Sequence, residues 1–211
     1  LLAHLGADVL KVERPDRGDS SRRYGPFPED KPHPEKSGQF LHLNTSKRGV
    51  TLNAGMRIGR ELLLALLKTR DVILESFRPG TMEQFGLGPD VLRDRFPGLV
   101  ITSISNFGQT GPYSKYKGYD LTAWNASGVA HRYLGEPDRA PLRAAWYHAD
   151  HWGAICAAVA TNIAVLARDL LGEGQHVDLS QSDVLACHVM GYQLVSVYNM
   201  NGDWSVRTGE S

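Results

Sequence analysis

Short apolar segments alternate with amphipathic segments along the first half of the chain, and this alternation most constrains the fold. Four segments predict strands because they are short, apolar and partly β-branched: 8–13, 49–52, 72–76 and 99–104. Helices are predicted between or beside them: 56–68, a segment from Thr81, and 89–96. Strands that alternate with helices imply right-handed crossovers and a parallel sheet. We therefore predict an α/β protein with a Rossmann-like parallel sheet and flanking helices.

The second half predicts a mostly helical segment that begins near Asp120. A long apolar run at 148–167 predicts a helix that ends in the turn 172–175, and a strand-like segment follows at 176–180. The most apolar part, 152–167, is shorter than the roughly 17–25 residues that cross a bilayer. We therefore expect a buried helix of a soluble protein, without a membrane partner.

Charge and cysteine usage narrow the class of protein. The 23 basic and 23 acidic residues give a formal net charge of zero, whereas a nucleic-acid-binding protein has a basic excess. Cys156 and Cys187 lie in apolar helical stretches and predict reduced core residues in a cytoplasmic protein. No signal peptide pattern is present. The turn at 1–6 resembles the end of a helix and residues 209–211 are polar, so we expect a fragment of a longer protein.

Charged and aromatic residues stand near the ends of the predicted strands, where open parallel sheets bind ligands. We expect these residues to gather on one rim: Arg14, Lys47, Arg48, Phe77, Arg78 and Phe107. Arginine forks onto phosphates and stacks on purines, so the set suits a nucleotide with phosphates. The alternative is that these are solvated charges on surface loops. No Gly-x-Gly-x-x-Gly motif or P-loop follows a predicted strand, which argues against a dinucleotide or ATP site.

Asp150 lies at the start of the long apolar helix and has two interpretations. Aspartate is among the best N-cap residues, and a carboxylate in a field of backbone N–H groups also serves as a nucleophile. The two roles can coexist. His148 and His151 are ligand types, but with Asp150 they do not share one helix face, and no further partner stands at a metal-binding spacing. We therefore predict no metal site.

Taken together, these segments resemble CoA-transferase family III, also called the CaiB/BaiF family. The matching residues run in the same order along almost the whole chain: 5–15, Gly18, Asp19, Arg22, Leu43, Asn44, Lys47, Arg48, 71–72, 75–80, 107–113, Tyr119, Asp120, Gly128, 172–175, Val177, Asp178 and Ser180. The resemblance implies an interlocked homodimer. Members are about twice as long, so residues 1–211 would be the N-terminal large, CoA-binding domain without its first strand and helix and without the C-terminal part.

The resemblance also implies which residues form the site. The family's catalytic aspartate precedes the helix that leads to the glycine-glutamine turn, and counting back from Gln175 this position is Asp150. The residues implied near CoA are Arg14, Leu43, Asn44, Lys47, Ser76, Phe77 and Arg78. Gln84 departs from the pattern, because related members often have a basic residue there. Tyr119 stands where related racemases have a histidine.

The implied activity is transfer of CoA between an acyl-CoA and a carboxylic acid, through an aspartyl-CoA thioester on Asp150. A carboxylate is ionised at neutral pH and needs no general base to attack a thioester. Backbone amides at the helix start would stabilise the oxyanions. CoA thioester is then a substrate, and no tightly bound cofactor is implied. The alternatives are an acyl-CoA racemase or epimerase of the same superfamily and a non-catalytic CoA-binding module.

Overall fold

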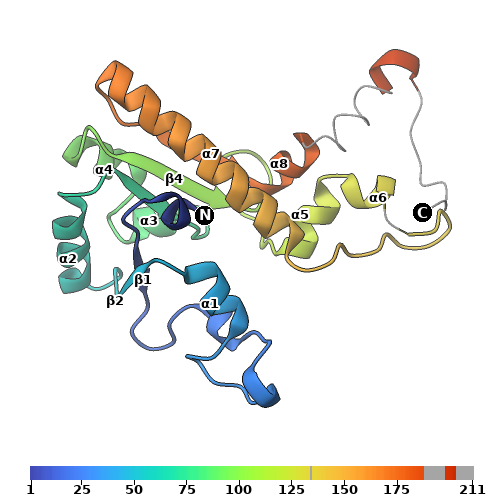
Figure 1. Ribbon diagram of the computed structural model, residues 1–211. Helices are drawn as coiled ribbons and strands as arrows, with labels where there is room; N and C mark the ends of the chain where they lie inside the picture. The colour runs from blue at the N-terminus through green and yellow to red at the C-terminus, as the bar shows by residue number, and fades with distance from the viewer. Residues whose placement is uncertain (134, 188–197, 203–211) are drawn as a thin grey trace. The chain divides into compact units, whose positions relative to one another are not determined.

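The computed structural model describes residues 1–133, 135–187 and 198–202, and the chain falls into two compact units, Leu1–Thr69 and Arg70–Ser211. Each unit contains a parallel sheet with helices beside it (Figure 1). The predicted α/β class and parallel pairing are confirmed, but the strands form two sheets rather than one. The assignment of residues 1–211 to a single large domain of a longer protein stays a prediction.

The first unit is built on two parallel strands. Strand β1 (Leu10–Glu13) pairs in register with β2 (Arg48–Thr51), starting from Leu10 opposite Arg48. The helices and 3-10 turns of the unit are η1 (Leu2–Leu5), η2 (Ser20–Arg23), η3 (Pro28–Asp30), α1 (Gly38–Asn44) and α2 (Arg57–Leu67). The sequence predicts this helix, but the face it buries carries Leu63, Leu64 and Leu67, while Ile58 and Leu62 of the predicted apolar spacing are exposed.

The long loop after β1 is held by ion pairs close to that strand. Arg22 donates from Nε and Nη2 to the two carboxylate oxygens of Glu13, at 2.8 and 3.0 Å. Its guanidinium also lies 3.7 Å from the centre of the Phe40 ring. Lys11 pairs with Asp19, whose side chain in turn caps η2. These contacts hold the loop that begins with Arg14 in place, although it contains no long helix or strand.

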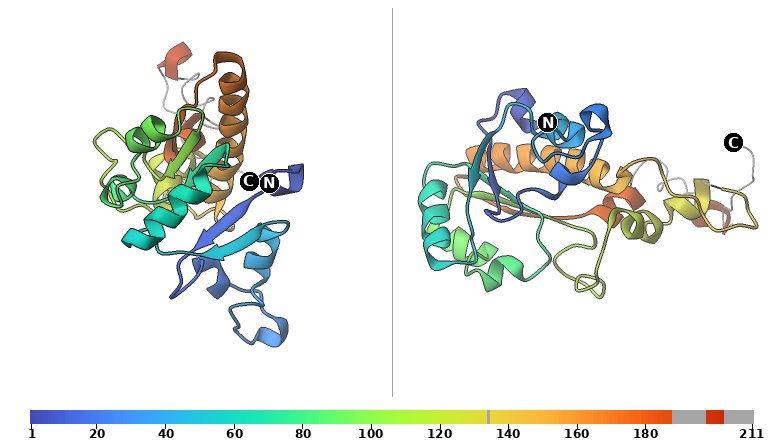
Figure 2. Two further views of the ribbon diagram at one scale, coloured as in Figure 1. Left: turned by 90° about the vertical axis from the view of Figure 1, so that its left-hand side faces the viewer. Right: turned by 90° about the horizontal axis from the view of Figure 1, so that it is seen from below.

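The second unit is built on three parallel strands in the order β3 (Val72–Glu75), β4 (Val100–Ser105) and β5 (His176–Ser180). Helix α7 (His148–Leu171) covers one face of this sheet, and α3 (Thr81–Gln84) and α4 (Pro89–Arg95) lie on the opposite side (Figures 1 and 2). A buried hydrogen bond of 2.8 Å between the hydroxyls of Thr102 and Thr161 ties α7 to the central strand. Because the three strands are parallel, their carboxyl ends lie at the same edge of the sheet.

Helix α7 ends at the turn that the sequence predicts. It contains 24 residues and continues to Leu171, where Gly172 in the left-handed conformation ends it. By length and composition it could cross a membrane, a property that core helices of soluble proteins share. One face packs on β4 and β5, while an apolar stripe on the helix is exposed: Ile155, Val159, Ile163, Leu166 and Leu170.

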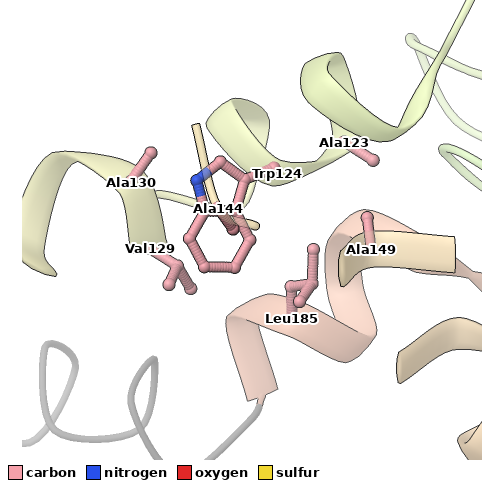
Figure 3. Packing of buried hydrophobic residues seen from close by; sticks show 7 residues of the cluster. All are labelled: Ala123, Trp124, Val129, Ala130, Ala144, Ala149 and Leu185. Atoms are coloured by element: carbon pink, nitrogen blue, oxygen red, sulfur yellow. The ribbon is translucent and has the colours of Figure 1, made fainter. Parts of the chain in front are cut away.

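A small apolar cluster fixes the beginning of α7. It joins that helix to α5 (Asp120–Ala126), α6 (Val129–Tyr133) and α8 (Gln181–Cys187) around Trp124 (Figure 3). Ala149 in the first turn of α7 is fully buried in it, and Leu185 of α8 packs there too. Because Ala149 is held in this way, the position of the next residue, Asp150, is set by packing.

Candidate functional site

A cavity of about 450 Å³ lies at the carboxyl ends of β3 and β4, within the second unit. Its wall combines residues that follow β3, residues that end or follow β4, and residues from the first two turns of α7 and the start of α8: Ser76, Phe77, Arg78, Pro79, Ile104, Ser105, Asn106, Phe107, Asp150, Ala154 and Gln181. Ser114, Tyr116 and Gly118 complete it. The structure therefore brings four of the predicted site residues together, namely Ser76, Phe77, Arg78 and Asp150.

Asp150 is not the N-cap of α7, so that interpretation of the sequence is wrong. The N-cap is Tyr147, whose side chain makes no capping bond, and Asp150 is the third helical residue. The cap comes from Asp120, the first residue of α5, whose Oδ1 accepts from the backbone N–H of Ala149 at 2.7 Å and of Asp150 at 3.1 Å. Asp120 precedes Asp150 by 30 residues, and a local pattern cannot indicate a cap of this kind. Because Asp120 caps the helix, the Asp150 carboxylate is not needed as a cap and lies at the cavity wall.

All four amides in the first turn of α7 already have acceptors. The N–H of His148 donates to the carbonyl of Trp146, that of His151 donates to the carbonyl of Tyr147, and the two between them donate to Asp120. The expectation that these amides stabilise an oxyanion is therefore wrong for this structure. A donor for such a charge has to come from a side chain or from another part of the backbone.

The side-chain amides of Asn106 and Gln181 form a chain of hydrogen bonds that ends at the Asp150 carboxylate. Gln181 donates from Nε2 to Asp150 Oδ1 at 2.9 Å, and its Oε1 accepts from Asn106 Nδ2 at 2.8 Å. The Gln181 side chain is buried, while Asn106 is half-buried. Gln181 directly follows β5 and Asn106 directly follows β4. Sequence reasoning did not select Gln181, although the rule for strand ends applies to it as it does to Ser76.

The surroundings of Asp150 raise the pKa of its carboxyl group. The largest cause is the removal of water from the carboxyl at the cavity wall, although the residue as a whole stays exposed. The hydrogen bond from Gln181 acts in the opposite direction, the nearby Asp120 carboxylate raises the pKa further, and His151 lowers it. A carboxyl group at a cavity with a perturbed pKa is typical of a functional site.

The segment after β3 is shaped by Glu75, which lies beneath it. Glu75 Oε2 accepts from the backbone N–H of Phe77 at 2.7 Å, and burial raises the pKa of this carboxyl group. The exposed Phe77 ring packs edge-on against Phe85, with centroids 5.7 Å apart. Ser76, Phe77 and Arg78, which carry a hydroxyl, an aromatic ring and a cation, line the cavity.

The remaining predicted residues belong to the first unit. Leu43 and Asn44 end α1, and Lys47 donates from Nζ to Asn44 Oδ1 at 3.0 Å. Burial lowers the pKa of Lys47, and the positive charge of Lys11 lowers it further. Arg14 is exposed and directly follows β1.

Lys47 and Arg48 do not lie at the carboxyl ends of the strands, so this part of the rim prediction is wrong. Lys47 directly precedes β2, and Arg48 begins β2 opposite Leu10, at the amino ends of both strands, where its Nη2 binds Asp8 Oδ2 at 2.6 Å. Arg14, in contrast, follows the carboxyl end of β1. The sequence shows that Lys47 and Arg48 adjoin a strand, but the direction of the strand decides at which end they lie.

The histidines near Asp150 are engaged in local contacts. Trp152 donates from Nε1 to His148 Nε2 at 2.8 Å, and the Nδ1 of His151 lies 2.6 Å from the carbonyl of Tyr147. In the described part of the chain no three His, Cys, Asp or Glu side chains are grouped to hold a metal ion. Tyr119 is exposed and is the N-cap of α5.

Comparison with known proteins assigns the sequence to one family. The sequence model described as CoA-transferase family III matches residues 1–211. Among curated proteins, the chain is 37% identical to a succinate–glutarate CoA-transferase of Agrobacterium fabrum, over 91% of this chain and 49% of that protein. It is also 37% identical to a succinyl-CoA:mesaconate CoA-transferase of Haloarcula marismortui, over 100% of this chain and 53% of that protein.

Solved structures agree with the sequence comparison. A CaiB/BaiF family protein from Brucella suis superposes with a TM-score of 0.87 at 32% identity, covering 98% of this chain and 53% of that one. Rv3272 from Mycobacterium tuberculosis superposes with a TM-score of 0.82 at 32% identity, covering 94% and 54%. The chain therefore spans about half the length of the relatives that it matches.

Proposed function

The chain belongs to CoA-transferase family III, and on that premise we propose that it moves CoA from an acyl-CoA to a carboxylic acid through a thioester on Asp150. The observation that carries the proposal is the Asp150 carboxylate at the cavity wall. One of its oxygens is held by Gln181, and Ser76, Phe77 and Arg78 line the same cavity. Such an arrangement supplies a fixed carboxylate beside a cation and an aromatic ring.

The reaction needs no change in net protonation. The Asp150 carboxylate attacks the thioester carbonyl and the C–S bond breaks, so that CoA leaves as a thiolate and the acyl group stays on Asp150 as a mixed anhydride. The thiolate then attacks the aspartyl carbonyl, the anhydride C–O bond breaks, and the first acid leaves as its carboxylate. The enzyme now holds CoA as a thioester, and an acceptor carboxylate reverses these steps. Since the thioester bond energy is conserved, the scheme requires no ATP.

CoA binding is proposed for two sets of residues. The resemblance to the family assigns Ser76, Phe77 and Arg78 to this role, and their position at the cavity supports the assignment. It assigns the same role to residues of the first unit: Arg14, Leu43, Asn44 and Lys47. Arginine and lysine bind phosphate groups through charge-assisted hydrogen bonds. Succinyl-CoA is the first donor to assay, because similar relatives carry succinate or succinyl-CoA in their names.

Homodimerisation is a further part of the proposal. The residues Ile155, Val159, Ile163, Leu166 and Leu170 of α7 are between 45% and 76% exposed and form a stripe along the helix. A stripe of this kind is stabilised when another apolar surface covers it. We expect light scattering to give twice the monomer mass for the full-length protein, and a monomer at assay concentration would contradict this.

The deciding experiment is intact-mass analysis of the full-length protein after mixing with succinyl-CoA and rapid quenching. The wild type should gain the mass of CoA less one water, and Asp150→Asn should gain nothing while remaining folded by circular dichroism. Hydrolysis of the adduct should regenerate the unmodified mass. An adduct of equal yield on Asp150→Asn would exclude Asp150 as the nucleophile. A racemase would instead exchange the α-hydrogen of a 2-methylacyl-CoA in heavy water without transferring CoA.

A further inference from the structure

Gln181 lies where negative charge develops when the Asp150 carboxyl carbon is attacked. Its Nε2 donates to Asp150 Oδ1 at 2.9 Å. We propose that Gln181 is the oxyanion donor for the steps at the Asp150 carboxyl carbon, and that Asn106 holds the Gln181 amide in the donating orientation. The inference rests on the proposed nucleophilic role of Asp150 and adds a residue to it.

The orientation of the Gln181 amide follows from the chemistry of its two neighbours. An ionised carboxylate only accepts hydrogen bonds, so the NH₂ group of Gln181 has to face Asp150. Its Oε1 then faces Asn106, which donates from Nδ2 at 2.8 Å. The backbone carbonyl of Asn106 also accepts from the N–H of Ser182 at 3.0 Å, so the start of α8 and the end of β4 are held together. A reversed Gln181 amide would lose both side-chain bonds.

Two glycines leave the space that this chain of amides occupies. A Cβ on Gly153, one turn after Asp150, would lie 2.8 Å from Gln181 Cγ, and a Cβ on Gly118 would lie 2.4 Å from Asn106 Cβ. Both distances are shorter than van der Waals contact allows. A side chain at either position would therefore displace one of the two amides, which shows how closely the surrounding backbone fits them.

The reaction places charge on the oxygen that Gln181 contacts. When Oδ2 attacks the acyl carbon, Oδ1 stays as the carbonyl oxygen of the aspartyl group in the mixed anhydride. The CoA thiolate then attacks the aspartyl carbon, and the C=O electron pair moves onto Oδ1. The pair returns as the bond to Oδ2 breaks and the first acid leaves. A donor already within hydrogen-bonding distance of Oδ1 stabilises this charge without reorganisation.

A side-chain donor is also needed because the backbone amides at the start of α7 are already hydrogen-bonded. The four amides of its first turn are occupied by Asp120 and by two carbonyl groups, so they are not available to Oδ1. Gln181 is the donor that the described residues place on Asp150 Oδ1. Gln181 as a residue is only 8% exposed, so water competes little for its amide. These conditions strengthen a hydrogen bond to a developing charge.

The test compares variants of the full-length protein by rapid-quench formation of the CoA adduct. Gln181→Met keeps the length of the side chain and removes the donor. We expect its rate of adduct formation to fall by roughly 100- to 1,000-fold, as for loss of one oxyanion donor, with KM for acyl-CoA changed less than about threefold. The hydrogen bond from Gln181 lowers the pKa of Asp150, so its removal should raise that pKa and move the acid limb of the rate profile to higher pH. A purely structural role would not move that limb.

Matched controls separate the possible failures. Asn162→Ala removes an amide of α7 that donates to the carbonyl of Ala158 within the same helix, and it should leave the rate unchanged. Asn106→Ala should slow adduct formation when it is the only substitution. It should slow the reaction little further in the Gln181→Met background, because both substitutions act through the Gln181 amide. Adduct formation at the wild-type rate in Gln181→Met, with Asp150→Asn inactive, would overturn the role of Gln181 alone. Absence of an adduct on the wild type would overturn the proposed function as well.

Discussion

Replacing Asp120 with alanine removes the acceptor that two backbone amides of α7 share. Loss of an N-cap acceptor costs about 0.5–2 kcal/mol, and loss of a negative charge at a helix N-terminus costs about 0.3–1 kcal/mol more. We therefore expect the free energy of unfolding to fall by about 2 kcal/mol. Asp120→Asn keeps an oxygen that can cap the helix, so only the charge contribution of about 0.3–1 kcal/mol should be lost.

Urea titration of the full-length protein measures these differences, and amide hydrogen exchange locates them. In Asp120→Ala the amides of Ala149 and Asp150 should exchange faster, while the middle of α7 stays protected. Asp90→Ala is the matched control, because Asp90 stands in the first turn of α4 and no side chain caps that helix. If Asp120→Ala leaves both the urea midpoint and these two amides unchanged, the cap across 30 residues does not stabilise the protein.

Three further predictions follow from single contacts. Arg78→Ala should raise KM for succinyl-CoA by about tenfold or more, since a charge-assisted phosphate contact contributes about 1.5–3 kcal/mol, and an unchanged KM would remove Arg78 from the CoA site. Gly153→Ala should slow adduct formation with little loss of α7, because its Cβ would displace Gln181; steady-state kinetics and circular dichroism measure the two effects. Burial raises the pKa of Asp19, but the bonds from Lys11 and Ser21 outweigh it and lower the pKa to about 2. The stability that Asp19 contributes is thus present above its ordinary pKa of 3.8 and lost as pH falls toward 2. Asp19→Asn should therefore make the urea midpoint depend less on pH over this range.

Local patterns in the sequence predict the elements of the fold well. The segment 176–180 predicts a strand and β5 has these bounds, and the segment 56–68 predicts a helix and contains α2. Proline at 89 begins α4, as its fixed backbone angle favours. These features depend on residues within a few positions of one another, so the sequence contains them directly.

Features that depend on distant residues were not predicted. Four strands in alternation with helices suit one sheet, but pairing is decided by which strands meet, and here they form two sheets. Asp120 and Asp150 are both acids near a helix start, and only packing of α5 against α7 shows that the first caps the helix of the second. Gln181 looks in sequence like one polar residue at the start of a helix, and its contacts with Asn106 and Asp150 form only when β4 and β5 pair in register.

The capping of α7 and the proposed chemistry of Asp150 depend on each other. A helix start that kept its amides free would attract the Asp150 carboxylate to them, as an N-cap aspartate does. Asp120 accepts those amides, so Asp150 can face the cavity, where Gln181 holds one oxygen. The arrangement also makes opposite shifts measurable. Removing the Asp120 charge should lower the pKa of Asp150 and move the acid limb of the rate profile to lower pH, whereas removing the Gln181 donor should move it to higher pH. Shifts of the same sign in Asp120→Asn and Gln181→Met would mean that the titrating group is not Asp150.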